Sequence, residues 1–157
     1  MPNIIISRIN STDSLYQQVW DLREEVLRIP LGLSLKNEDL SRDKINTIFI
    51  ALHEGKTIGC VFMQPIDKKE VQLRAMAVYN EWQGKGVGRL LVQAAEEWAW
   101  NEGYNKIILH ARKVAIGFYK TLGYNTSGDQ FTEVGIPHYM MKKPRPLTTY
   151  DSRLTTP

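Results

Sequence analysis

A glycine-rich turn between an apolar run and a helical pattern constrains this chain more than any other feature. Its residues are Gln83, Gly84, Lys85, Gly86, Val87, Gly88 and Arg89. The apolar run 73–79 precedes it, and the helical pattern 90–100 follows it. Glycine lets a backbone approach a ligand closely and adopt positive φ. The N–H groups of such a turn point to one place, and the helix N-terminus adds partial positive charge. The turn therefore predicts a phosphate-binding loop.

The spacing within the turn distinguishes three phosphate-binding patterns. A P-loop needs a Gly-Lys pair followed by Ser or Thr, whereas Gly86 follows Lys85. A dinucleotide-binding loop needs G-x-G-x-x-G, but the third glycine would fall on Arg89. The third pattern is Q/R-x-x-G-x-G/A, and Gln83, Gly86 and Gly88 match it completely. For the loop alone, a purely structural turn remains the alternative.

A second motif lies further along the chain. It runs Ala115, Ile116, Gly117, Phe118, Tyr119, Lys120, Thr121, Leu122, Gly123 and Tyr124. Ala115, Phe118, Tyr119 and Leu122 share one helical face, and Gly123 suits a left-handed C-cap. The pair of motifs, in this order, resembles the GNAT superfamily of acyl-CoA-dependent N-acyltransferases. The first motif is similar to its pyrophosphate loop and the second to its A-x-x-F/L-Y-x-x-L/M-G-F/Y signature.

The composition favours one ordinary domain. The chain has 157 residues, of which 43% are hydrophobic and 24% charged, and its net charge is +3. This length suffices for a sizeable core. We expect residues 1–143 to form the GNAT domain and 144–157, rich in proline and hydroxyl side chains, to form a flexible tail.

The same composition argues against several partners and locations. No Lys/Arg cluster of the nucleic-acid type occurs, and no apolar run reaches the ~20 residues of a membrane span. Cys60 is the single cysteine, so a reducing compartment is natural. We therefore expect a cytoplasmic protein that contacts neither nucleic acid nor membrane; a homodimer is left open.

The hydrophobic periodicity predicts alternating strands and helices. Strands are expected at 4–9, 47–53, 57–64, 71–78, 106–111, 124–127 and 137–142. Helices are expected from a cap at 11–13 to about Arg28, where Pro30 stops the first, then after the glycine loop, and at 113–122. This order agrees with the GNAT fold, an α/β fold with a mixed, mostly antiparallel sheet and helices on both faces. The resemblance implies that the sheet is splayed between the strands 71–78 and 106–111.

The resemblance also implies where acetyl-CoA would bind. The pantetheine arm would enter the splay and pair with the strand 71–78 like an added strand. Its contacts would be the backbones of Met76 and Val78, and the pyrophosphate would lie on the amides of 84–89. A backbone N–H near Met76 or Ala77 would stabilise the oxyanion. Arg112 stands where many relatives have an asparagine that contacts pantetheine; it would reach a phosphate or point outward.

The reaction that the resemblance implies is acetyl transfer to a primary amine by direct attack in a ternary complex. Tyr119 occupies the position of the tyrosine that protonates the leaving thiolate in many relatives, the alternative being a core aromatic. The amine must lose a proton, since its pKa is about 10. Many relatives carry a glutamate base in the strand where this chain has Gln72 and Arg74.

Three other residues are candidates for that base, with a water relay as the alternative. They are Glu133, His138 and His110. The run E-x-G-I-P-H around the first two is similar to the ElaA-like branch of the superfamily, as is Leu22-Arg23-x-x-Val26-Leu27. No metal is expected, because three scattered His and one Cys lack ligand spacing. The acceptor amine is not specified. The alternative function is a non-catalytic acyl-CoA-binding sensor or interaction module on the same fold.

Overall fold

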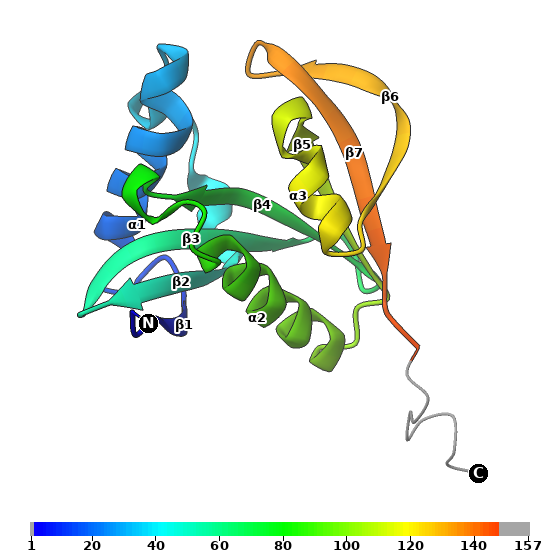
Figure 1. Cartoon of the computed structure of the whole chain (residues 1–157), viewed down its shortest axis with the longest axis horizontal. Coiled ribbons are helices and arrows are strands. Elements are labelled where there is room, and N and C mark those ends of the chain that lie inside the picture. The colour runs from blue at the N-terminus through cyan, green and yellow to red at the C-terminus, as the bar shows by residue number, and fades with distance from the viewer. Residues whose placement is uncertain (1, 148–157) are drawn as a thin grey trace.

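The computed structural model describes residues 2–147, which form one seven-stranded sheet flanked by helices (Figure 1). The strands are β1 (Ile5–Ile9), β2 (Thr47–His53), β3 (Lys56–Pro65), β4 (Glu70–Val78), β5 (Lys106–Arg112), β6 (Asn125–Glu133) and β7 (Ile136–Pro144). Their spatial order is β1-β2-β3-β4-β5-β7-β6, and only the β4–β5 pair is parallel. The predicted mixed, mostly antiparallel fold is confirmed.

Helices cover both faces of the sheet, as predicted. Helix α1 (Tyr16–Arg23) packs Val19 and Leu22 on one face, against Ile48, Ile50 and Phe62. Helices α2 (Val87–Asn101) and α3 (Ile116–Thr121) lie on the other face (Figure 1). Their core there includes Val61, Leu73, Leu91, Leu109 and Met141. The periodicity of the sequence therefore produces two apolar layers, one on each side of the sheet.

The first helix differs from its prediction in its second half. After α1, the chain forms a π-helical segment, η1 (Glu24–Arg28), and then a 3-10 turn at Ile29–Leu31. Pro30 lies at the start of that turn, where a backbone N–H would have no acceptor within the helix, so proline costs no hydrogen bond there. A π-helical turn widens the helix. It brings Val26, Leu27 and Arg28 to the rim of the cleft described below.

The sixth strand is longer than the predicted 124–127. β6 pairs with β7 through Asn125–Ser127, shifts register, and pairs again from Phe131 to Glu133. Most of its side chains are exposed, so it lacks the apolar alternation on which a sequence prediction depends. The extension matters because it brings the end of β6 close to the end of β5.

The sheet opens between β4 and β5. These strands pair only through Glu70–Leu73 and Lys106–Leu109, whereas β4 stays paired with β3 as far as Val78. A one-residue bulge interrupts the β3–β4 ladder opposite Cys60–Phe62, and Ala75 there has φ 52°. A bulge bends its strand, so β4 turns away from β5. The predicted splay is confirmed.

Most of the predicted flexible tail, 144–157, lies outside the described residues. Of the part described, the Arg145 amide donates to the Asn105 carbonyl at 2.8 Å. The prediction of a flexible tail therefore stays a prediction. Among the described residues, no helix is both long and apolar enough to cross a membrane.

Candidate active site

A cleft of about 1090 Å³ lies where β4 and β5 diverge. Its walls come from η1, the two diverging strands, the glycine loop, α3 and the β6–β7 turn. The predicted site residues that line it are Met76, Ala77, Val78, Gln83, Gly84, Gly86, Val87, Gly88, Arg89, His110, Arg112, Tyr119, Glu133 and His138. Lys85 is the exception; its ammonium lies 5.1 Å from the centre of the Trp82 ring. Residues distant in sequence thus share one cavity.

The glycines of the loop serve two different purposes. Gly84 and Gly86 have φ 76° and 84°, and a Cβ on either would meet nothing within 4 Å. They are needed for a left-handed backbone and leave open surface above it. Gly88 differs from the expectation, because its φ is not positive; a Cβ there would lie 3.2 Å from the Phe118 ring. Its smallness therefore lets α3 approach the start of α2.

The loop presents backbone donors to the cleft. Gly86 is the N-cap of α2, and the first helical bond runs from the Leu90 amide to the Gly86 carbonyl at 3.1 Å. The amides of the first helical turn have no acceptor within the helix. The Gln83 side-chain amide donates to the Val78 carbonyl at 2.9 Å and to Asn80 Oδ1 at 3.2 Å. These bonds fix the loop to the end of β4, so its donors face the open edge of that strand.

The backbone of β4 alternates between its neighbour and the gap. The Ala75 carbonyl accepts from the Cys60 thiol at 3.4 Å, and the Tyr79 amide donates to the Ile58 carbonyl at 3.0 Å, so both of these backbone groups face β3. Successive peptide groups in a strand point to opposite sides. The Met76 carbonyl and the Val78 amide therefore point into the gap, where an extended ligand could pair with them.

Tyr119 places a neutral hydroxyl on the α3 side of the cleft. Its ring is 6% exposed and packs edgewise on Phe118 and Tyr124, with centroids 5.0 and 5.8 Å away. Burial raises the pKa of Tyr119, so the hydroxyl keeps its proton at neutral pH. Within residues 2–147 no group accepts a hydrogen bond from it. The hydroxyl is thus a proton donor without an internal partner.

The three candidate bases meet around one carboxylate. Glu133 Oε1 lies 2.9 Å from His110 Nδ1, and Glu133 Oε2 lies 3.7 Å from His138 Nε2. His138 is buried, and its Nδ1 lies 3.0 Å from the Ile136 carbonyl. His110 and Glu133 are more open, with 28% and 45% of their side chains exposed. A neutral His110 that donates Nδ1–H to Glu133 keeps the lone pair of Nε2 free to take a proton.

The comparisons with known proteins show the family and the fold. The model of the acetyltransferase (GNAT) family matches residues 12–124. The chain belongs to the GNAT acetyltransferase family. Membership supports acyl transfer from an acyl-CoA as the general class of its activity.

Individual relatives of this GNAT protein span most of its length. The uncharacterized protein YyaT of Bacillus subtilis is 27% identical over 129 residues, which are 76% of this chain and 86% of YyaT. The crystal structure of Escherichia coli ElaA superposes with a TM-score of 0.79 at 17% identity, covering 90% of this chain and 99% of ElaA. A GNAT family acetyltransferase from Elizabethkingia anophelis, with acetyl-CoA bound, gives a TM-score of 0.68 at 17% identity over 90% and 98% of the two chains.

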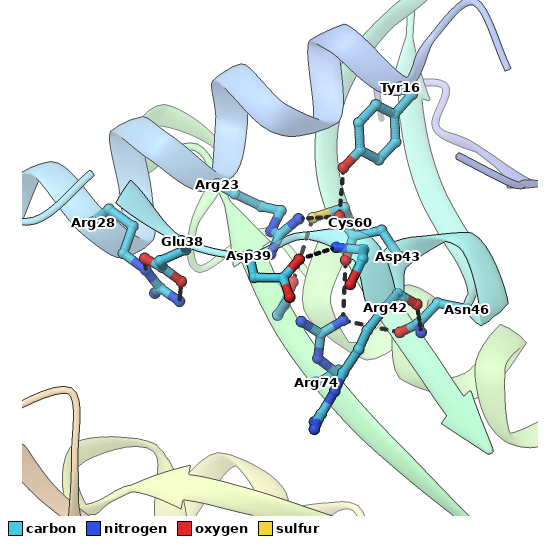
Figure 2. A network of polar contacts seen from close by, with 12 residues as sticks. Tyr16, Arg23, Arg28, Glu38, Asp39, Arg42, Asp43, Asn46, Cys60 and Arg74 are labelled. Carbon is cyan, nitrogen blue, oxygen red and sulfur yellow. Dashed lines mark hydrogen bonds and ion pairs between the residues drawn. The ribbon is translucent and has the colours of Figure 1, made fainter. Parts of the chain in front are cut away.

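This GNAT protein also carries a buried polar cluster that the sequence interpretation missed. Figure 2 shows Tyr16, Arg23 and Arg74 converging on Asp43. Arg23 and Asp43 are each 2% exposed, with Arg23 Nη1 2.9 Å from Asp43 Oδ2. Arg74 Nη1 lies 3.4 Å from Asp43 Oδ1 and donates to Asn46 Oδ1 at 2.9 Å. Both arginines line the cleft, opposite the α2 face.

Only part of this cluster carried a sequence signal. Arg23 interrupts the apolar face of the first helix beside Leu22, and Arg74 is, with Gln72, one of the two positions at which the family resemblance led us to expect a glutamate. Asp43 lies in a segment with no periodicity, and its partners are 20 and 31 residues away along the chain. Arg112 was expected to reach a phosphate or point outward, but its Nη2 donates to the Leu27 carbonyl at 3.3 Å. It thus links the end of β5 to η1.

Among the described residues, no cluster of three or more His, Cys, Asp or Glu side chains could hold a metal ion.

Proposed function

We propose that this protein transfers the acetyl group of acetyl-CoA to a primary amine by direct attack in a ternary complex. One observation carries the proposal: the phosphate loop, the open edge of β4, the Tyr119 hydroxyl and the His110–Glu133 pair all face one cleft. The acetyl-CoA-bound structure of the Elizabethkingia anophelis relative supports the same donor here. Residues 1–143 would form the acetyltransferase domain, and the single buried cysteine suits a cytoplasmic location.

Acetyl-CoA would bind along β4. The pantetheine amides would pair with the Met76 carbonyl and the Val78 amide, as a strand pairs with a sheet edge. The pyrophosphate would accept from the amides at the start of α2, and Arg89 would add a full charge. The thioester would then lie deeper in the cleft, between Tyr119 on one side and His110 on the other.

The protein would supply two proton transfers to the chemical step. His110 Nε2 would remove a proton from the ammonium group, while Glu133 fixes the ring tautomer and stabilises the imidazolium that forms. The free amine attacks the thioester carbonyl, so a C–N bond forms and the C–S bond breaks. Tyr119 would give its proton to the departing thiolate. A buried neutral phenol suits this role because it carries the proton at neutral pH.

The burial of Cys60, the single cysteine of the chain, disfavours a mechanism through an acyl-cysteine intermediate. Cys60 is fully buried, and burial raises the pKa of its thiol to about 12. A thiolate is the nucleophilic form of cysteine, so Cys60 is inert at neutral pH. Direct attack by the amine needs no such residue.

Calorimetry and initial-velocity kinetics test this proposal. Acetyl-CoA and CoA should each bind with one site per chain, and double-reciprocal plots against acetyl-CoA at several amine concentrations should intersect. Parallel lines would contradict direct attack. Binding of CoA without acetylation of any amine in a broad panel would instead indicate a non-catalytic acyl-CoA-binding module.

The assignment of the base has its own test. His110→Gln should lower kcat by about 10²–10⁴-fold, the usual contribution of a general base, with CoA affinity unchanged. Glu133→Gln should lower kcat less, because the imidazole remains. His53→Gln is the matched control, since His53 lies on β2 outside the cleft. Equal kcat for His110→Gln and His53→Gln would remove His110 from the mechanism.

A further inference from the structure

The cleft wall that faces α1 is rich in arginine. Four arginines line it besides Arg89 of the glycine loop. They are Arg23 at the end of α1, Arg28 of η1, Arg74 of β4 and Arg112 of β5. Among the described residues that line it, Glu133 is the one carboxylate, and it is paired with His110. An arrangement with such an excess of cations attracts an anion. The positive charge available to an anion depends on how many of these arginines have an acidic partner.

Arg28 is already neutralised. Its Nε and Nη2 lie 2.6 and 3.2 Å from the two carboxylate oxygens of Glu38. Arg112 has no acidic partner among the described residues; it donates only to the Leu27 carbonyl. Burial and the charge of Arg28 both lower the pKa of Arg112, although an arginine remains protonated. The Arg112 charge is thus available to a ligand.

Arg23 and Arg74 share a single carboxylate. Asp43 accepts from Nη1 of each, and it also accepts from the Tyr16 hydroxyl. Burial, then the hydrogen bond to Asp43, raises the pKa of Tyr16 to about 12, so Tyr16 adds no negative charge. The cluster contains two guanidinium groups and one carboxylate, an excess of one positive charge. Burial, and then the charge of Arg23, lowers the pKa of Arg74, because both disfavour a positive charge at that position.

The cluster packs against Phe62 and contains an unpaired donor. The guanidinium carbons of Arg23 and Arg74 lie 4.6 and 5.4 Å from the centre of the Phe62 ring. Arg23 Nε is buried and has no hydrogen-bond partner in the described part of the chain. Arg74, with 27% of its side chain exposed, is the member that reaches the open cleft. The hydrogen bonds of Arg74 to described residues all run from Nη1, so its Nε and Nη2 can donate to an anion in the cleft.

The anion site faces the candidate base. Arg74 is paired across the ladder with Phe62, which packs under α1. On β5, Leu109 and Ala111 point to the α2 face, so alternation places His110 and Arg112 on the α1 side with Arg74. A molecule whose anion is bound by Arg74 can therefore extend its amine toward His110.

We propose that the acceptor is a small amine that carries a carboxylate, such as an amino acid, and that Arg74 and Arg112 bind that carboxylate. The inference rests on the acetyltransferase function proposed above and names its acceptor class. The Arg23–Asp43–Arg74 cluster has one excess positive charge, and Arg112 adds a second one that no described carboxylate neutralises. A guanidinium fork binds a carboxylate through two parallel hydrogen bonds.

Matched pairs of amines test the proposal. Each L-amino acid is compared with its carboxamide and with its aminophosphonate analogue, at equal concentrations of the free amine form. The carboxylate should give at least a tenfold higher kcat/KM than the carboxamide for the preferred side chain. Equal efficiency of the two, or a preference for the carboxamide, would overturn the proposal, and a preference for the phosphonate would reassign the anion.

Variants then locate the anion site. Arg74→Gln should raise KM for the carboxylate at least tenfold, change kcat little, and leave KM for the carboxamide unchanged. Arg112→Gln should act in the same direction, which keeps the test valid if Arg74→Gln destabilises the fold. Arg42→Gln is the control for charge alone, because Arg42 is exposed and does not line the cleft. An equal effect of all three variants would contradict the site.

Binding measurements separate this inference from the proposed function. Calorimetry of the CoA-loaded protein with the carboxylated amines should show binding that Arg74→Gln weakens while CoA affinity stays constant. If CoA binds and neutral amines are acetylated preferentially, the inference fails and the acetyltransferase stands. If CoA does not bind, the proposed function fails. Carboxylated amines that bind the wild-type protein and the Arg74→Gln variant equally would refute the anion site regardless of turnover.

Discussion

Two tyrosines in contact with each other offer a sharp test of the proton donor. Tyr119 and Tyr124 pack edgewise 5.8 Å apart and are 6% and 1% exposed. Burial raises the pKa of both. They differ in the hydroxyl: Tyr124 donates to Glu96 Oε2 at 2.7 Å, whereas Tyr119 lines the cleft and its hydroxyl has no hydrogen-bond partner within residues 2–147. Replacing each by phenylalanine removes one oxygen and keeps the ring.

The two substitutions should have opposite effects. Tyr119→Phe breaks no internal hydrogen bond, so its melting temperature should stay within about 2 °C of the parent. Without the acid, kcat should fall by about 10²–10⁴, which corresponds to about 2.7–5.4 kcal/mol at the barrier. Tyr124→Phe loses a hydrogen bond to a charged group, worth about 1.5–3 kcal/mol. At about 2–4 °C per kcal/mol for a chain of this size, the melting temperature should fall by about 3–12 °C, with kcat unchanged.

The assay pairs thermal unfolding with steady-state kinetics on the same preparations. A kcat for Tyr119→Phe within threefold of the parent would refute the acid role. Tyr119 would then be a packing residue, and water would protonate the thiolate. A large loss of kcat in Tyr124→Phe as well would show that packing around α3, rather than the Tyr119 proton, limits the rate.

Three further perturbations test other parts of the molecule. Gly86→Ala and Gly103→Ala both place a Cβ on a left-handed residue with nothing within 4 Å; each should cost about 1–2 kcal/mol of stability, but only Gly86→Ala should weaken CoA binding in calorimetry. Asp43→Asn leaves the buried Arg23 charge without its counter-ion and should cost about 3–5 kcal/mol, against little change for the exposed Asp39→Asn in the same thermal scan. Because burial raises the pKa of Cys60 from its ordinary 9.0 to about 12, the unfolded chain binds fewer protons above pH 9, and its unfolding free energy should decline as pH rises from there; a smaller decline in Cys60→Ala would identify the thiol as a source, and an unchanged one would exclude it.

Local patterns predicted those elements whose stability depends on near neighbours. The strands 47–53, 57–64 and 71–78 carry apolar residues that each bury against a helix, and the structure places them within one or two residues. The glycine loop could be predicted from the sequence because the left-handed φ of Gly84 and Gly86 favours glycine. The extension of β6 could not be predicted from the sequence, since its exposed polar side chains are typical of a loop. Only its backbone pairing with β7 makes it a strand.

The candidate site shows the same division. The glycine loop and Tyr119 lie in contiguous motifs, so the sequence alone identified both as candidates, and the structure places both at the cleft. His110, Glu133 and His138 were separate candidates, because nothing in the sequence indicates that β6 runs far enough for Glu133 to reach β5. The Asp43 cluster joins three segments through charge pairing, a long-range interaction that no periodicity records.

The presence of Arg23 beside β4 bears on both Arg74 and the proposed base His110. A glutamate in β4 would lie beside Arg23, and pairing with that guanidinium would lower its basicity. With Arg74 in its place, β4 would bind an anion, and the base would come from another wall of the cleft. The extended β6–β7 hairpin places Glu133 next to His110 of β5, which faces the same side as Arg74, and this pair is the proposed base. In this proposal Arg74 of β4 and Arg112 of β5 would bind the negative group and His110 would face the amine, which suits an acceptor with a negative group at one end and an amine at the other.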